Sequence, residues 1–210
     1  MLGFSRDSSA EEPSFCDVNN VVKDTIRLLG DRFLREVEVS FKPSTDLPPA
    51  VGSKDFIQQI LLNFIFNAAE ATSPERGQLV RADDTDAGGG KTGADQAPAR
   101  ERRGQAVRAP IIIVAARRTP EPLSEMVLTP AAAPGYVTIS VQDFGCGIAP
   151  ENRARLFEPF FTTKALSTRR GTGLGLSMAY ELARKMGAGL AFESQVGQGS
   201  TFFLVLAASE

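Results

Sequence analysis

The chain has 210 residues, of which 42% are hydrophobic and 23% charged, and its net charge is −2. This composition is typical of one globular domain, and the charge provides no field that would attract nucleic acid. The chain contains no histidine, which excludes histidine-based acid–base chemistry and the most common metal ligand within it.

The two cysteines, Cys16 and Cys146, form no CxxC pair and cannot complete a zinc site by themselves. A reducing, cytoplasmic compartment is therefore expected. No apolar run is long enough to span a bilayer, and the first residues do not resemble a signal peptide. We expect no membrane contact by this chain, although a longer parent protein can be anchored elsewhere.

The first predicted elements are a helix, a strand and a second helix. Residues 1–16 look like the end of an upstream segment, and Asp17 is the expected N-cap of a helix of about 18 residues. The apolar face of this helix would contain Val18, Val22, Ile26, Leu29 and Phe33. Apolar and polar residues alternate over 37–41, which predicts a half-buried strand, and Val51 adds a short strand. Ser53 then caps a helix that runs to Ala71.

The remaining predicted elements are mainly strands. Residues 75–109 lack apolar periodicity and predict a disordered insertion, whereas 111–114 and 136–141 predict strands separated by a proline-rich loop. Residues 149–170 predict a loop with a short helix. A helix is expected over 174–186, with Leu174, Met178, Leu182 and Met186 on one face and Gly187 after its end. Strands at 190–192 and 201–206 would follow, joined by a glycine-rich turn at 195–199. The order predicts an α/β sandwich with helices on one face of the sheet.

A polar stripe crosses the otherwise apolar helix that ends at Ala71. Its members, at helical spacing, are Gln59, Asn63, Asn67 and Glu70. Asparagine is a poor helix former, and buried amides need partners, which phosphate oxygens and Mg²⁺ would supply. The alternative is a narrow face that points to solvent.

A glycine-rich segment, Gly171-Thr172-Gly173-Leu174-Gly175-Leu176, opens the predicted helix at 174–186. Backbone N–H groups at a helix N-terminus favour phosphate, and Thr172 adds a hydroxyl donor. The segment matches neither the dinucleotide-binding fingerprint nor the Walker A motif. Glycines that serve packing alone are the competing interpretation.

A second glycine-rich segment, Asp143-Phe144-Gly145-Cys146-Gly147-Ile148, follows a predicted strand. Its carboxylate can accept a hydrogen bond from an amino group, and its glycines allow a flat ring to approach the backbone. An Asx-type turn at a strand end is the alternative. The match to the DFG motif of eukaryotic kinases fails, because that family's HRD loop requires histidine.

A phenylalanine-rich segment lies between the two glycine motifs. Residues 156–164 read Leu-Phe-Glu-Pro-Phe-Phe-Thr-Thr-Lys, and a short loop with Arg169 and Arg170 follows. A mobile lid carrying cations would cover a triphosphate. The alternative is a plain surface loop over a small hydrophobic cluster, which is a frequent arrangement.

Together these segments resemble the catalytic and ATP-binding domain of sensor histidine kinases, in the superfamily shared with DNA gyrase, the MutL repair protein and a heat-shock chaperone. Residues 61–71 resemble the N box, 143–148 and 171–176 the two glycine boxes, and 157–164 the F box. All four occur in the family's order. The Ala-Ala-Glu-Ala sequence at 68–71 and the short lid look most like the nitrogen-regulation class.

The resemblance implies a Bergerat-type fold over residues 17–208: a two-layer α/β sandwich with a mixed, mostly antiparallel sheet. It implies ATP and Mg²⁺ as cofactors, with Asn67 as the metal ligand and Asn63 and Lys164 also in catalytic roles. Asp143 would receive the adenine amino group, and Gly147 would lie beneath the ring. The full set of implied nucleotide-binding residues is Asn67, Glu70, Asp143, Gly145, Gly147, Ile148, Phe157, Thr163, Lys164, Arg170, Gly171, Thr172, Gly173, Leu174 and Gly175.

The resemblance also implies partners: a dimerisation domain that carries the phosphoacceptor histidine, and the receiver domain of a response regulator. Because this chain has no histidine, it is expected to be the ATP-binding half of a longer kinase, with residues 1–16 as the tail of the dimerisation helix. Two other departures are Phe144, where the family usually has asparagine, and the long insertion after Ala71.

Three alternatives remain at this point. A gyrase- or MutL-type ATPase would need a catalytic glutamate one turn before the metal-binding asparagine, where this chain has Asn63, and Glu70 is a weaker substitute. A serine kinase of the anti-sigma-factor type would match the phenylalanine-rich segment less well. A pseudokinase that acts as a binding scaffold would not need the motifs intact.

Overall fold

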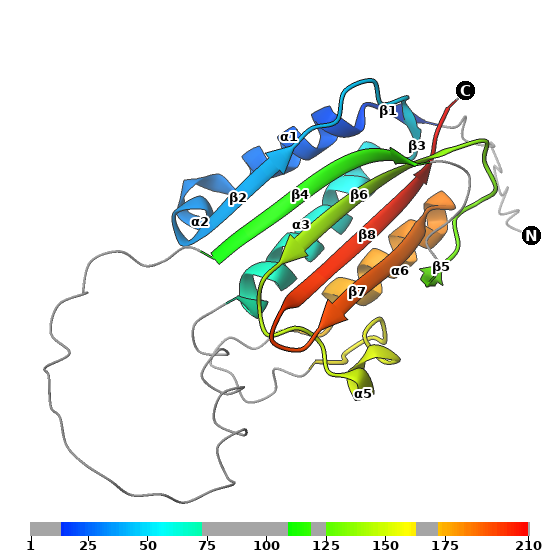
Figure 1. The fold of residues 1–210 in the computed structure, drawn as a ribbon. Helices are drawn as coiled ribbons and strands as arrows, with labels where there is room; N and C mark the ends of the chain where they lie inside the picture. Colours follow the sequence, from blue (N-terminus) through cyan, green and yellow to red (C-terminus); the bar gives the residue numbers. More distant parts are fainter. Residues whose placement is uncertain (1–13, 73–108, 119–124, 163–171, 210) are drawn as a thin grey trace, which may run out of the picture.

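The computed structural model describes residues 14–72, 109–118, 125–162 and 172–209 (Figure 1). The predicted insertion at 75–109 therefore lies almost wholly outside the described residues. The elements in chain order are β1 (Phe15–Cys16), α1 (Val18–Leu28), α2 (Gly30–Glu36), β2 (Val37–Lys42), β3 (Ala50–Val51), α3 (Lys54–Ala71), β4 (Ala109–Arg118), β5 (Met126–Leu128), β6 (Tyr136–Asp143), α5 (Pro150–Arg153), α6 (Gly175–Met186), β7 (Gly189–Gln195) and β8 (Gly199–Ala207).

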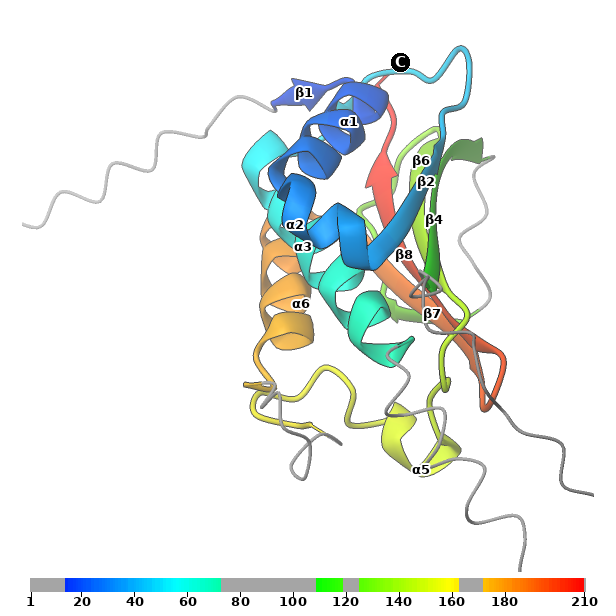
Figure 2. The same cartoon turned by 90° about the vertical axis from the view of Figure 1, so that its left-hand side faces the viewer.

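Two layers make up the fold. A six-stranded sheet has the order β2-β4-β6-β8-β7-β5, and α1, α2, α3 and α6 lie against one of its faces (Figures 1 and 2). Only β2 and β4 pair in parallel; the other neighbours are antiparallel. The predicted α/β sandwich with a mixed, mostly antiparallel sheet is therefore confirmed.

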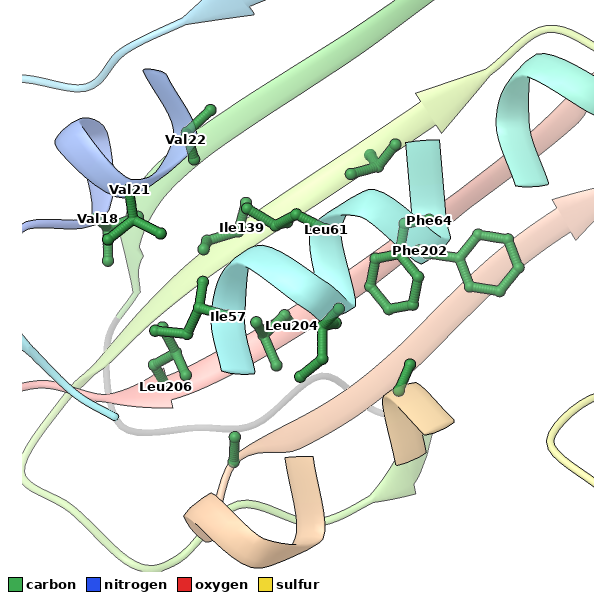
Figure 3. Packing of buried hydrophobic residues seen from close by; sticks show 14 of the residues in the cluster. Val18, Val21, Val22, Ile57, Leu61, Phe64, Ile139, Phe202, Leu204 and Leu206 are labelled. Atoms are coloured by element: carbon green, nitrogen blue, oxygen red, sulfur yellow. The ribbon is translucent and has the colours of Figure 1, made fainter. Parts of the chain in front are cut away.

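The core lies between α3 and the helix-facing side of the central strands (Figure 3). Ile57, Leu61 and Phe64 of α3 are fully buried, because the apolar residues of this helix meet the sheet on one side and α1 and α6 on the other. From the sheet, alternate residues of β6 and β8 reach the same core, as strand geometry requires. Burying each such side chain contributes roughly 1.5–3 kcal/mol, so α3 is held firmly in place.

The first predicted helix is wrong in one respect, because the structure divides it in two. Gly30 has a φ of +72°, a left-handed conformation that interrupts the helix after Leu28. Asp17 does cap α1 as predicted, its side chain accepting a hydrogen bond from the Asn20 N–H at 3.1 Å. Ser53 also occupies the N-cap position of α3, but its side chain makes no capping bond.

Two further expectations need correction. Met178 was grouped with three other residues on one apolar face of α6, yet 42% of it is exposed. The buried residues of this helix are Ser177, Ala179 and Ala183. Strand β5 lies where only a proline-rich loop was expected, and it pairs with β7. The helix bounds of α3 and the left-handed Gly187 after α6 were predicted correctly.

The N-terminal residues of the described part form a small ladder of their own. Phe15 and Cys16 of β1 pair with Val51 and Ala50 of β3, and Ala50 also bridges Ala208 after the last strand. In the part of the chain that the structure describes, no helix is both long and apolar enough to cross a membrane.

Candidate functional site

A cavity of about 490 Å³ opens at one end of the two layers. It is lined by the last two turns of α3, the loop after β6, the start of α6 and the end of the β7–β8 hairpin. The lining residues are Asn63, Phe66, Asn67, Glu70, Ala71, Cys146, Gly147, Ile148, Ala149, Asn152, Leu156, Phe161, Thr162, Thr172, Gly173, Gly175, Leu176, Val196, Ser200 and Phe202. Its volume falls in the range of small-molecule sites.

Two asparagines of α3 face this cavity with unsatisfied amides. The Nδ2 atoms of Asn63 and Asn67 are buried and have no hydrogen-bond partner among the described residues. Gly175 at the start of α6 lies next to Asn63, since a Cβ at that glycine would be in van der Waals contact with the Asn63 Oδ1 at 3.4 Å. Buried polar groups without a partner are costly and rare, so this arrangement indicates a ligand that accepts hydrogen bonds.

The glycine-rich segment at 143–148 is fixed to α3 and to the β7–β8 turn. The Cys146 N–H donates to the Ala71 carbonyl at 3.2 Å, and the Gly197 N–H donates to the Cys146 carbonyl at 2.8 Å. A Cβ at Gly145 would collide with the Ala71 carbonyl, and one at Gly147 with the Gln195 carbonyl. These glycines therefore allow close backbone packing, a role independent of any ring above them.

Asp143 ends β6 as a buried carboxylate, only 2% exposed. Its Oδ1 accepts hydrogen bonds from the N–H groups of Gly145 at 2.9 Å and Ser200 at 3.3 Å. The first of these bonds closes the Asx-type turn that was the alternative interpretation. Burial raises the pKa of Asp143 above its ordinary value, and the two N–H donors partly offset this effect.

This raised pKa makes stability depend on pH. Because the folded state holds the Asp143 proton more tightly than the unfolded chain does, the free energy of unfolding falls as pH rises from the ordinary carboxyl range through the raised pKa. We expect Asp143→Asn, whose amide oxygen can accept the same two hydrogen bonds, to lack this loss. Urea unfolding over the acidic to neutral range should show the variant gaining stability over the wild type as pH rises; parallel curves would contradict the assignment.

The phenylalanine-rich segment divides between core and cavity. Phe157 packs against Tyr180 and Phe192, with ring centroids 6.2 Å apart in both pairs, and does not line the cavity. Phe161 does line it, with the Arg155 guanidinium 4.6 Å from its ring centroid. Phe160 is 74% exposed, and its N–H donates to the Gly173 carbonyl at 2.9 Å. This bond joins the phenylalanine-rich segment to the glycine-rich segment at 171–176.

Many of the site residues predicted from the sequence line the cavity. Those in its lining are Asn63, Asn67, Glu70, Gly147, Ile148, Thr172, Gly173 and Gly175. Asp143, Gly145, Phe157 and Leu174 are near its walls in sequence but are absent from the lining. Thr163, Lys164, Arg170 and Gly171 lie outside the described residues, so their roles stay predictions.

Sequence reasoning missed two residues that matter here. Phe66 of α3 faces the cavity and contacts Phe33 of α2 edge to face, with centroids 5.4 Å apart. Ser200 lines the cavity beside Asp143. Neither carries a local signal, although the strand pairing of Asp143 with Ser200 would have identified the second.

The second half of the chain, residues 106–210, matches a protein family described as histidine kinase-, DNA gyrase B- and HSP90-like ATPases. The chain belongs to this family. Its relatives in this ATPase family include the sensor kinase CckA of Brucella abortus, 30% identical over 98% of this chain and 18% of that protein. Another is the sensor histidine kinase ZraS of Escherichia coli, 28% identical over 90% of this chain and 30% of that protein.

Solved structures of this ATPase family show the same fold. The catalytic domain of the histidine kinase ThkA aligns with a TM-score of 0.60 at 20% identity, covering 94% of this chain and 96% of that one. Full-length ShkA in complex with AMPPNP aligns with a TM-score of 0.59 at 24% identity, covering 96% of this chain and 33% of that one. The chain therefore corresponds to the ATP-binding catalytic domain of sensor histidine kinases, and it spans less than a third of the length of the named sensor kinases. Its assignment to the nitrogen-regulation class stays a prediction.

Proposed function

We propose that this chain binds Mg·ATP in the cavity beside α3 and donates the γ-phosphoryl group to a histidine on a dimerisation domain. A response regulator would then receive the phosphoryl group. The observation that carries the proposal is the pair of unpartnered amides of Asn63 and Asn67. The AMPPNP bound by ShkA, a structural relative, supports a nucleotide as the ligand.

The amide pair fits the phosphate end of such a ligand. Each Nδ2 can donate to a phosphate oxygen, which is the acceptor that the ligand-free protein lacks. The Oδ1 of Asn67 is a hard oxygen ligand of the kind that Mg²⁺ prefers. We therefore assign Asn67 to the cation and Asn63 to the phosphates. When bound, Mg²⁺ would neutralise charge on the β- and γ-phosphates.

The opposite part of the cavity, lined by Gly147, Val196 and Ser200, fits the base. We call it the base end, and the part lined by Asn63 and Asn67 the amide end. The apolar surface of Ile148 and Phe202 can cover a flat ring, and the buried Asp143 carboxylate can accept a hydrogen bond from an exocyclic amino group.

In this proposal the protein acts mainly by positioning the phosphates of ATP and stabilising their charge. The amide end holds the polyphosphate, and the first residues of α6 line the cavity, where a helix N-terminus stabilises negative charge. Lys164 and Arg170 are proposed as cations over the transferring group. Phosphoryl transfer requires little covalent chemistry from the protein beyond position and charge, so the nucleophile can come from another domain.

Isothermal titration calorimetry with Mg·ATP tests the proposal directly. Binding that weakens when EDTA removes the metal is the expected result. If the folded chain releases or absorbs no heat at any temperature and ATP does not shift its thermal unfolding, the proposal fails and a scaffold role takes its place.

A second expected result follows from composition. Because the chain contains no histidine, incubation with γ-labelled Mg·ATP should leave no acid-labile, base-stable label on it. Label should appear on the dimerisation domain of the parent kinase when that domain is supplied separately. Acid-labile, base-stable label on this chain itself would contradict the division of donor and acceptor between domains.

A further inference from the structure

Three polar side chains form a row across adjacent strands at the base end. Asp143 of β6 pairs with Ser200 of β8, and Ser200 pairs with Ser194 of β7. Hydrogen bonds connect the three side chains: the Ser200 N–H donates to the Asp143 Oδ1, and the Oγ atoms of Ser200 and Ser194 lie 3.0 Å apart. Of the three, only Ser200 lines the cavity.

The hydrogen bonds of Ser194 determine which way the serine protons point. The Ser194 Oγ lies 3.1 Å from the Gly199 carbonyl, which can only accept, and 2.8 Å from the Ile148 N–H, which can only donate. A hydroxyl has a single proton. With its proton on the Gly199 carbonyl and the Ile148 N–H donating to it, the Ser194 Oγ has one lone pair left, and in this assignment that lone pair accepts the proton of Ser200.

This arrangement leaves Ser200 with lone pairs toward the cavity and no free proton. Ser200 is 5% exposed, so its hydroxyl has little freedom to find another acceptor among water molecules. Next to it, the Asp143 carboxylate is an acceptor as well. The base end consequently presents the acceptor oxygen of Ser200, with the Asp143 carboxylate buried next to it, and this complements a ligand group that carries N–H donors.

We propose that Ser194 is a positioning residue that orients the Ser200 hydroxyl as an acceptor and so selects purines with an amino group at position 6 over 6-oxo purines. The inference rests on the proposed nucleotide-binding function. A 6-oxo purine would place a carbonyl oxygen against the Ser200 oxygen, next to the buried Asp143 carboxylate, and would leave buried acceptors unpaired, which is the costly mismatch in polar sites. Without Ser194, the Ser200 proton can turn toward the cavity and donate to that carbonyl.

The test compares the dissociation constants of Mg·ATP and Mg·ITP, which differ at position 6 and at N1, where only ITP carries a proton. Calorimetry on the whole chain should show a preference for ATP in the wild type. The ratio of the two constants should fall by about three- to tenfold in Ser194→Ala, the effect of one neutral hydrogen bond. Ser194→Thr, which keeps the hydroxyl, should retain the ratio. If Ser194→Ala does not fold, Ser194→Cys, a poor donor of similar size, is expected to lower the ratio in the same way.

Double variants separate positioning from support of the fold. Ser200→Ala should lower the ratio by itself, and adding Ser194→Ala to it should change the ratio no further, because the hydroxyl to be oriented is gone. A Ser194→Ala effect that weakens ATP and ITP equally, or a wild type that binds both equally, overturns the inference while leaving nucleotide binding intact. A wild type that binds neither nucleotide overturns the proposed function itself.

Discussion

Asn67→Ala is expected to weaken Mg·ATP binding by roughly 100-fold, because it removes a hydrogen bond to a charged phosphate and an oxygen ligand of the cation. The same change should not destabilise the ligand-free protein. It removes a buried Nδ2 that has no partner among the described residues, and alanine is the better helix former, so a gain of about 1 kcal/mol in unfolding free energy is expected. Calorimetry and urea unfolding measure the two effects.

A matched control is available on another helix. Asn19 of α1 is half-buried outside the cavity, and its Nδ2 donates to the Ser44 carbonyl at 2.8 Å. Asn19→Ala removes this bond together with a buried Oδ1 that has no partner among the described residues, so it should change the unfolding free energy by less than about 1 kcal/mol and leave the ATP affinity unchanged. An Asn67→Ala protein that binds Mg·ATP as well as the wild type would remove Asn67 from the site.

Gly147→Ala is expected to disrupt the base end severely. Gly147 has a φ of +69°, and a Cβ there would collide with the Gln195 carbonyl. The side chain must strain the backbone and also separate the loop from the β7–β8 turn. A loss of about 3 kcal/mol in unfolding free energy is expected, together with loss of Mg·ATP binding, because this loop lines the cavity.

Gly197→Ala separates the two causes. Gly197 has a φ of +78°, but a Cβ added there meets nothing within 4 Å. The variant therefore carries only the left-handed backbone cost of about 1–2 kcal/mol. Equal losses in the two variants, measured by urea unfolding, would show that the contact between Gly147 and Gln195 does not constrain the site.

The sequence predicted best those features that depend on neighbours along the chain. The bounds of α3 follow from its apolar residues and its caps, and the spacing of Asn63 and Asn67 places both on one face by helix geometry alone. The continuous β-branched run at 111–114 likewise located β4. Gly30 was not expected to interrupt the first helix, because hydrophobic periodicity continues across it although the backbone does not.

Features created by long-range pairing could not be predicted in this way. Strand β5 has three residues and exists because it pairs with β7, with a shift in register between Met126 and Leu128. The row of Asp143, Ser200 and Ser194 likewise requires the register of three strands, which no local pattern specifies. Gly145 and Gly147 were expected to let a flat ring approach the backbone, whereas their nearest contacts are the backbones of Ala71 and Gln195.

The bond from Cys146 to the Ala71 carbonyl gives the cavity a fixed length. Asn63 and Ala71 belong to one continuous helix, and eight residues of helix span about 12 Å. Because the loop at the base end is attached to the last residue of that helix, the two ends of the cavity cannot approach or separate without breaking the bond from Cys146 to Ala71 or deforming the helix. The helix therefore sets the distance between the two ends of the cavity. The cavity suits ligands whose two recognised groups are separated by about the length of eight helical residues.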